Sequence, residues 1–247
     1  MRVIGIIPAR YGSTRFPGKP LAMIGHKTMI RRTYERSAQS SLDAVVVATD
    51  DQRIYDEVQG FGGHAVMTRA DHRSGTDRCR EALDLMEISA DAVVNIQGDE
   101  PFIDPLQIDR VAELIRRPDV CLATLVKPIN DPARLANPNV VKAVLDNDGH
   151  ALYFSRQAIP FVRGVEPSQW LHNVECYQHI GIYAYKADTL RAVSAMPQGR
   201  LERAESLEQL RWLENGLRIH AAVVPAGDAI AIDTPDDLLN LPQDLFQ

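Results

Sequence analysis

The segment VIGIIPARYGSTRFPGKPL, residues 3–21, joins a short apolar run to a loop rich in cations. The run Val3–Ile7 is almost continuously hydrophobic, which predicts a strand buried on both faces of a sheet. The loop that follows holds three cations, the hydroxyl residues Ser13 and Thr14, two glycines and three prolines. In open α/β sheets, ligands bind where strands end and the chain turns. The segment therefore predicts an α/β fold with a binding loop directly after its first strand.

The composition of this loop favours a polyanion as its ligand. Cationic side chains neutralise phosphate charge, and glycine and hydroxyl residues offer further hydrogen-bond donors. Prolines restrict the free loop, so less conformational entropy is lost when an anion binds. The loop is not a P-loop, because five residues separate Gly12 from Gly18 and Lys19 precedes Pro20 instead of Ser or Thr. Charge alone equally allows a cationic surface loop. The three cations are Arg10, Arg15 and Lys19.

Apolar runs alternate with helical patterns through the first half of the chain. We expect strands over Val3–Ile7, Ala44–Ala48, Ala65–Thr68, Ala92–Ile96 and Val120–Leu125. We expect helices over Thr28–Ser40, Gln52–Phe61, Asp77–Glu87 and Pro105–Arg117. Continuously apolar strands separated by helices indicate a mostly parallel sheet flanked by helices on both faces. The sequence therefore predicts an α/β core, to which we assign residues 1–126 and 186–247.

The pattern changes after residue 126 to one typical of antiparallel strands. Val140–Asp146 and His150–Ser155 flank Asn147-Asp148-Gly149, which predicts a hairpin. We expect further strands over Trp170–Tyr177, Gly181–Tyr185 and Ile219–Val224. We expect helices over Ala187–Ala195 and Ala204–Asn215 and a final helix from Pro235. We therefore predict a smaller antiparallel β excursion over residues 127–185.

The net charge, the lengths of the apolar runs and the cysteine count limit the possible partners and compartments of the protein. The net charge of -6 argues against general nucleic-acid binding, which requires a basic surface. No apolar run approaches the ~20 residues of a membrane span, and the N-terminal run is too short for a signal peptide. The cysteines Cys79, Cys121 and Cys176 are far apart and odd in number, which favours reduced thiols. We therefore expect a cytoplasmic protein that binds neither nucleic acid nor membrane.

An acidic turn follows another predicted strand, in the motif NIQGDEP (95–101). Gly98 allows a sharp turn that places Asp99 and Glu100 at the end of this strand. Mg2+ in proteins uses one or two carboxylates together with substrate phosphates. An acidic pair in a turn equally often faces solvent. In the second acidic cluster, residues 233–237, helix capping explains every residue except Asp233.

Eight motifs follow one another along nearly the whole chain. They are IIPARYGSTRFPGKPL (6–21), VATDD (47–51), MTRADHRSGTDR (67–78), NIQGDEPFI (95–103), ALYFSR followed by IP (151–160), HIGIYAY (179–185), SLEQLRWLENG (206–216) and IDTPDDL (232–238). In this order they closely resemble the 3-deoxy-manno-octulosonate (Kdo) cytidylyltransferase family. The resemblance implies a nucleotide-diphospho-sugar transferase-like fold. It also implies transfer of CMP from CTP to the anomeric hydroxyl of Kdo, or of an analogue such as the 8-amino form, for lipopolysaccharide or capsule synthesis.

The same resemblance implies the site residues. Two Mg2+ ions are expected with substrate bound, and the metal ligands are Asp99 and Asp233. The catalytic set is Arg10, Lys19, Asp99 and Asp233. The nucleotide set is Pro8, Ala9, Arg10, Ser13, Lys19, Arg73, Ser74 and Thr76. The sugar set is Arg15, Gln97, Arg156, His179, Tyr183, Glu208 and Gln209.

Each of these residues also has a structural alternative. Ser74 or Thr76 can cap a helix, and Tyr183 can pack within its strand. A lone histidine such as His179 is more often structural. Glu208 and Gln209 can form the solvent-exposed face of a helix. For the whole chain, the alternatives are a cytidylyltransferase for another acidic sugar, such as sialic acid, and a non-catalytic CTP-binding regulator. The resemblance also implies a homodimer, a nucleotide-binding role for the core (residues 1–126 and 186–247) and roles in sugar binding and dimerisation for residues 127–185.

Overall fold

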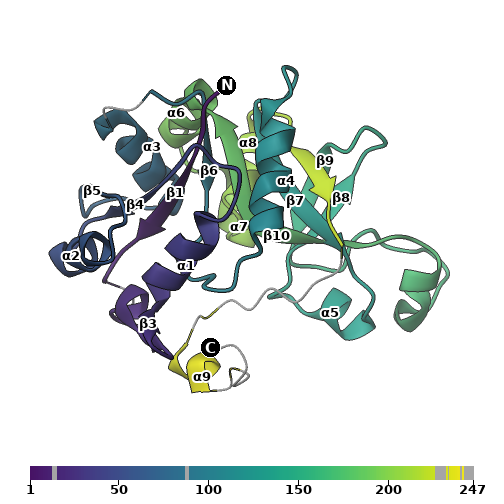
Figure 1. Ribbon diagram of the computed structural model, residues 1–247. Helices are drawn as coiled ribbons and strands as arrows, with labels where there is room; N and C mark the ends of the chain where they lie inside the picture. Colours follow the sequence, from purple (N-terminus) through teal and green to yellow (C-terminus); the bar gives the residue numbers. More distant parts are fainter. Residues whose placement is uncertain (13–15, 87–88, 226–231, 233, 240, 242–247) are drawn as a thin grey trace.

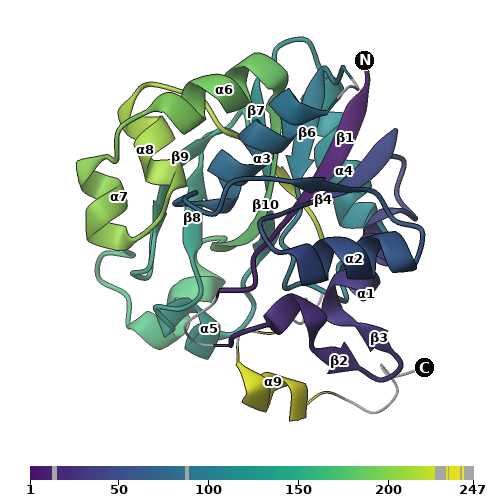
Figure 2. The same cartoon turned by 90° about the vertical axis from the view of Figure 1, so that its left-hand side faces the viewer.

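The computed structural model describes residues 1–12, 16–86, 89–225, 232, 234–239 and 241. A nine-stranded sheet forms the centre of the protein, and helices pack on both of its faces (Figures 1 and 2). Its strands are β1 (Val3–Ala9), β4 (Ala44–Thr49), β5 (Ala65–Met67), β6 (Ala92–Asn95), β7 (Leu122–Pro128), β8 (Lys142–Leu145), β9 (Ala151–Ser155), β10 (Tyr177–Lys186) and β11 (His220–Val223). The helices are α1 (Met29–Ser37), α2 (Gln52–Gly60), α3 (Gly75–Leu85), α4 (Pro105–Arg116), α5 (Pro132–Ala136), α6 (Ala187–Ala195), α7 (Arg200–Glu205), α8 (Gln209–Glu214) and α9 (Pro235–Leu239). Short 3-10 turns η1 (Lys19–Leu21) and η2 (Pro167–His172) and a small hairpin of β2 (Met23–Ile24) and β3 (Lys27–Thr28) complete the described elements.

The sheet is mostly parallel, as predicted. Its strand order is β11-β7-β10-β6-β1-β4-β5, and β10 is the antiparallel member of this path. Alternate residues of the buried strands face opposite layers. Ile7 and Val47 pack with α1, α2 and α4, whereas Ile4 and Ile6 pack with α3, α6 and α8. The predicted α/β class is therefore confirmed.

The antiparallel excursion spans a shorter range than 127–185, and its strand β8 stays joined to the nine-stranded sheet through β10. β7 continues to Pro128, and β10 re-enters the central sheet from Tyr177. Between them, β8 and β9 form the predicted hairpin, with Gly149 at φ 81° in its turn. A small separate cluster of Ile129, Leu135, Trp170 and Cys176 supports this region. The antiparallel excursion is confirmed, and the GIYAY strand is part of the central sheet.

Two predictions of secondary structure are wrong. Residues 170–172 belong to the 3-10 turn η2 instead of a strand, and Trp170 there buries its ring and donates its indole N–H to the Val165 carbonyl at 2.8 Å. The helix expected over Ala204–Asn215 is two helices, α7 and α8, separated by Ser206 in the left-handed conformation at φ 52°. Arg156 donates to the Glu205 carbonyl at 2.7 Å, which takes that carbonyl out of a continuous helix.

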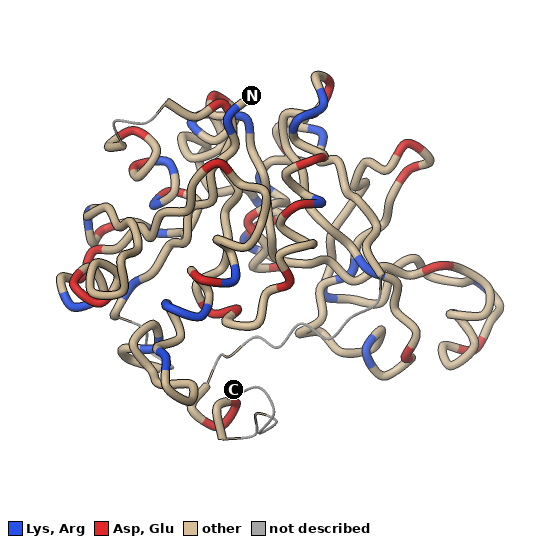
Figure 3. Tube along the Cα trace, in the orientation of Figure 1, with Lys and Arg blue, Asp and Glu red and all other residues tan. Residues whose placement is uncertain are grey.

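Opposite charges are interspersed along the chain in the view of Figure 3, without one large single-sign face. None of the helices in the described part of the chain is long and apolar enough to cross a membrane.

Candidate active site

A cleft of about 240 Å³ opens where β1 and β6 end side by side. The two strands are parallel, so the loops that follow them meet at the same edge of the sheet. The N-terminus of α3 forms a third wall. The lining residues are Pro8, Ala9, Arg10, Lys19, Pro20, His72, Arg73, Ser74, Gly75, Arg78, Gln97, Gly98 and Asp99. The structure thus brings together, in one cleft, most of the predicted nucleotide set.

Lys19 joins three segments that are distant in the sequence. Its ammonium donates to Asp99 Oδ2 at 2.8 Å and to the Ile232 carbonyl at 2.8 Å. The Ile232 N–H in turn donates to the Asp99 carbonyl at 3.1 Å. The cationic loop therefore faces the acidic turn. Asp233 lies outside the described residues, but its neighbour Ile232 runs directly beside Asp99.

The loop after β1 folds back on itself to present Lys19. Gly18 adopts φ 72° and donates its N–H to the Tyr11 carbonyl at 3.0 Å. A Cβ at Gly18 would lie 3.0 Å from the Tyr11 ring, so the turn favours glycine for both its conformation and its space. Arg10 is exposed and lines the cleft. Ser13 and Arg15, also predicted here, lie outside the described residues.

Gly98 lets the acidic turn approach β1 closely. A Cβ on this residue would stand 2.9 Å from the backbone oxygen of Pro8. Backbone cannot move aside as a flexible side chain can. We therefore expect Gly98→Ala to lower the free energy of unfolding by about 1–3 kcal/mol. Urea denaturation of both proteins measures this difference. Gly12→Ala, where a Cβ meets nothing within 4 Å, is the matched control and is expected to change stability less. Equal stabilities of the two variants would contradict the close approach.

The N-terminus of α3 is capped by Ser74, whose hydroxyl accepts from the Asp77 N–H at 3.1 Å. Arg73 and Ser74 line the cleft. Thr76 is buried and donates its hydroxyl to Glu208 Oε2 at 2.8 Å. Burial raises the pKa of Glu208, and the hydrogen bonds from Thr76 and Ser74 partly oppose that shift. Thr76 therefore links the nucleotide set to the sugar set instead of lining the cleft.

The predicted sugar residues do not share one cavity: Glu208 lines a second hollow, Gln97 lines the cleft, and Tyr183 and Gln209 are buried. Glu208 lines a hollow of about 450 Å³ that shares His72, Arg73 and Ser74 with the cleft. Gln97, in the wall of the cleft, donates to the Gly181 carbonyl at 3.2 Å. Tyr183 is buried, and its ring lies 5.0 Å from that of Trp212. Gln209 is also buried, at the start of α8.

Arg156 occupies a structural position in this geometry. Its guanidinium donates to the carbonyls of Glu205, Ser206 and Pro138 at 2.7, 3.4 and 3.2 Å. The Arg156 N–H donates to the Glu205 carboxylate at 2.9 Å. These bonds fix the break between α7 and α8, two residues before Glu208. Arg156 therefore shapes the segment that carries Glu208 and Gln209, and its predicted contact with sugar stays a prediction.

His179 is held as a neutral side chain. Its Nε2 lies 3.0 Å from the Thr124 hydroxyl, and the rings of Phe154 and Tyr183 stand 5.1 and 5.2 Å away. Burial lowers the pKa of His179 to about 3, below the ordinary value of 6.5. The unfolded chain therefore binds more protons than the folded chain between these two pH values.

We expect the free energy of unfolding to fall as the pH drops from about 6.5 toward 3, and part of this slope belongs to His179. His179→Gln should reduce the slope in urea denaturation series across this range. The control His172→Gln, at an exposed histidine, should leave it unchanged. An imidazole NMR signal of His179 that titrates near pH 6.5 would contradict this account.

Several lining residues were not predicted from the sequence. They are Pro20, His72, Gly75, Arg78 and Gly98. Arg78 is the most constrained: it is buried, donates to Thr68 Oγ1 at 2.6 Å and lies 3.3 Å from Asp50 Oδ2. The sequence signal that could have identified Arg78 is a cationic residue on the apolar face of the helix predicted over Asp77–Glu87. Next to Asp99, burial raises the pKa of Glu100 to about 7; the charge of Asp99 adds to the shift and Lys127 opposes it.

Comparison with known proteins agrees with this geometry. The family model described as cytidylyltransferase matches residues 4–219. A curated 3-deoxy-manno-octulosonate cytidylyltransferase of Bacteroides thetaiotaomicron is 53% identical over 241 residues, which cover 96% of each chain. An 8-amino-3,8-dideoxy-manno-octulosonate cytidylyltransferase of Shewanella amazonensis is 49% identical over 242 residues, again 96% of each chain.

A solved structure extends the comparison to three dimensions. The structure of CMP:2-keto-3-deoxy-manno-octonic acid synthetase complexed with CTP is 43% identical, with a TM-score of 0.89, and the match covers 97% of this chain and 96% of the other. Together with the cleft at the ends of β1 and β6, these matches show that the chain is a nucleotidyltransferase and belongs to the 3-deoxy-manno-octulosonate cytidylyltransferase family.

Proposed function

We propose that this enzyme transfers CMP from CTP to the anomeric hydroxyl of Kdo or of its 8-amino analogue and releases pyrophosphate. The observation that carries this proposal is the shared cleft, where Arg10 and the Lys19–Asp99 pair stand at the ends of β1 and β6. An adjoining hollow holds Glu208, a group suited to binding hydroxyls. The Bacteroides relative, at 53% identity, carries the name of the Kdo reaction, and the Shewanella relative carries that of the 8-amino form.

The cationic side chains stabilise the charge that develops during transfer. Attack on the α-phosphate leaves negative charge on that phosphate and on the departing pyrophosphate. Arg10 and Lys19 enter the cleft from the loop after β1 and can donate hydrogen bonds to these oxygens. Donors that are already in place cost little reorganisation when the charge develops. The loop thereby contributes to the transition state as well as to binding.

The residues present fit a magnesium site. Asp99 offers a hard oxygen ligand at the wall of the cleft, and the Ile232–Asp99 hydrogen bond brings the chain that leads into Asp233 alongside it. Asp99 and Asp233 would hold the ion. When bound, Mg2+ would neutralise triphosphate charge and lower the pKa of the sugar hydroxyl. Activity abolished by EDTA and restored by Mg2+ supports this assignment, and full activity in EDTA contradicts it.

A pyrophosphate-release assay tests the reaction class. With CTP, Mg2+ and Kdo or its 8-amino analogue, we expect release that depends on the sugar. Release with sialic acid alone would assign a different acidic sugar. Binding of CTP without release for any acceptor would indicate a regulator.

We also propose a cytoplasmic homodimer acting in lipopolysaccharide or capsule synthesis. Two apolar side chains in the antiparallel region are unusually accessible: Leu152 is 59% and Phe161 is 74% exposed. Apolar groups of this size on a strand-rich region are suited to an interface. Sedimentation should give a dimer at micromolar concentration. A monomer there contradicts the dimer.

A further inference from the structure

A second cluster of polar side chains lies at the opposite edge of the sheet from the cleft. His220 begins β11, and Asp119 and Cys121 come just before β7, so these residues lie at the amino ends of parallel strands. The cleft described above lies at the carboxyl ends. A hollow of about 570 Å³ joins these residues to the β8–β9 turn. It is lined by Arg117, Asp119, Cys121, Leu122, Asp148, His150, Gly216, Leu217, Arg218 and His220.

Two histidines face one another in this hollow. Nε2 of His150 lies 3.0 Å from Nε2 of His220, and the ring centroids are 4.3 Å apart. Backbone bonds hold the two in register, because Ala151 donates to the Ile219 carbonyl at 2.9 Å and Ala221 donates to the Gly149 carbonyl at 2.8 Å. The pair is therefore built into the fold and is not a chance contact of flexible side chains.

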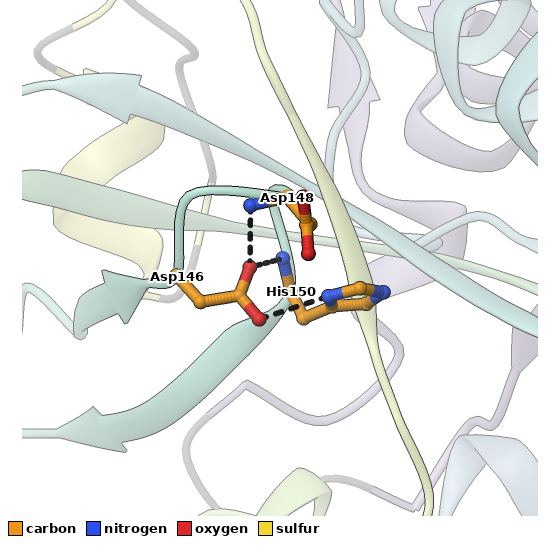
Figure 4. A group of neighbouring side chains, drawn as sticks. All are labelled: Asp146, Asp148 and His150. Atoms are coloured by element: carbon orange, nitrogen blue, oxygen red, sulfur yellow. Dashed lines mark hydrogen bonds and ion pairs between the residues drawn. The ribbon is translucent and has the colours of Figure 1, made fainter.

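Asp146 fixes the tautomer of His150. Its Oδ2 lies 2.9 Å from His150 Nδ1, and its Oδ1 accepts from the N–H groups of Asp148 and His150 at 2.9 and 2.8 Å (Figure 4). These bonds lower the pKa of Asp146, so the group is an ionised acceptor at neutral pH. A neutral His150 then keeps its proton on Nδ1 and directs the lone pair of Nε2 at His220. A carboxylate behind an imidazole is the usual support of a metal-binding histidine.

His220 can present a second lone pair at the same point. The side chain is buried, with 8% of the residue exposed, and its Nδ1 has no hydrogen-bond partner within the described residues. Burial lowers the pKa of His220, which favours the neutral ring. Because Nδ1 is not committed to a partner, the single proton can move there from Nε2. A cation can then replace the proton between the two Nε2 atoms.

The spacing of these atoms is close to that of two ligands on one ion. Nitrogens bound to tetrahedral Zn2+ at about 2.0–2.1 Å lie about 3.3 Å apart. The two Nε2 atoms lie 3.0 Å apart, so the two rings must move apart by a few tenths of an ångström to bind one ion. Asp119 Oδ2 lies 3.9 Å from His220 Nε2 and pairs with Arg117 at 2.6 Å, so a carboxylate stands within reach. Two imidazole ligands favour zinc, copper or nickel over magnesium.

We propose that His150 and His220 form a binding site for a borderline divalent cation, with Zn2+ as its representative, that is separate from the magnesium position at Asp99. Asp146 positions His150, Asp119 completes the set from the β7 side, and water from the open hollow supplies the remaining ligand. The bound ion joins the β8–β9 turn to β11, which is the edge strand of the sheet.

The test is Zn2+ binding to the full chain by titration calorimetry, with Mg2+ present in excess to occupy the other site. We expect one Zn2+ per chain and a rise of several degrees in Tm at saturating Zn2+. His150→Gln and His220→Gln should each weaken binding at least tenfold. His64→Gln and Asp99→Asn, controls at an exposed histidine and at the cleft, should leave it unchanged.

A spectroscopic measurement on the unmodified chain keeps the proposal testable if a variant fails to fold. Cu2+ bound in place of Zn2+ should give an electron paramagnetic resonance spectrum with hyperfine structure from two imidazole nitrogens. Absence of saturable Zn2+ binding, or binding that survives both histidine substitutions, would overturn the proposal. The pair would then be a hydrogen-bonded contact only.

Discussion

Replacement of Asp99 by asparagine is expected to lower kcat by about 10²–10³-fold, with little loss of stability. The variant keeps the size of the side chain and one oxygen that can accept from Lys19 at the 2.8 Å position. It removes the negative charge that would hold Mg2+ against the nucleotide. The fold should survive, because Asp99 lies in the wall of a cleft and not in the apolar core. Steady-state pyrophosphate release at saturating CTP and sugar measures kcat, and Mg2+ titration measures the apparent metal affinity.

Asp188→Asn is the matched control for this substitution. The Asp188 side chain is fully exposed at the start of α6 and does not line the cleft. Loss of the Asp188 charge should leave kcat within twofold of that of the unmodified enzyme. Near-normal turnover and Mg2+ response in Asp99→Asn would remove Asp99 from the metal site.

Lys19→Met is expected to lower kcat/KM for CTP by about 10²–10³-fold. Methionine retains much of the apolar stem but loses the ammonium that donates to Asp99 and to the Ile232 carbonyl. Two effects then add: a phosphate donor is lost, and Ile232 is held beside Asp99 by its backbone hydrogen bond alone. We therefore expect both a higher KM for CTP and a lower kcat, measured by initial rates over a range of CTP concentrations.

Lys27→Met separates this effect from a general loss of positive charge. Lys27 pairs with Glu35 at 2.5 Å on α1 and is not part of the cleft lining. Its replacement should change kcat/KM by less than twofold. If Lys19→Met behaves like this control, the ammonium has no part in binding or transfer.

Local sequence patterns predicted the central elements because their causes are local. Continuous apolar runs identified β1, β4 and β6, and the glycine turn after β8 identified the hairpin. The family resemblance placed Lys19 and Asp99 in one site, and the parallel strands β1 and β6 explain why they meet, since parallel strands place their following loops at one edge. The 2.8 Å contact shows that the two side chains meet, and their roles in binding and transfer stay predictions.

The features that the sequence did not predict depend on distant partners. The break between α7 and α8 arises because Arg156, about fifty residues earlier, binds the carbonyls of Glu205 and Ser206. No local pattern in SLEQLRWLENG contains that information. The place of β10 inside the central sheet is likewise a matter of non-local pairing, with β6 on one side and β7 on the other. Arg78 lines the cleft because Asp50 and Thr68 hold it from neighbouring segments.

The most direct test of the central claim is identification of the product by mass spectrometry. The purified chain is incubated with CTP, Mg2+ and a panel of acidic sugars that includes Kdo, its 8-amino analogue and sialic acid. We predict a CMP adduct of Kdo or of the 8-amino analogue together with an equal amount of pyrophosphate. A CMP adduct of sialic acid alone, or intact CTP with every sugar, would contradict the account.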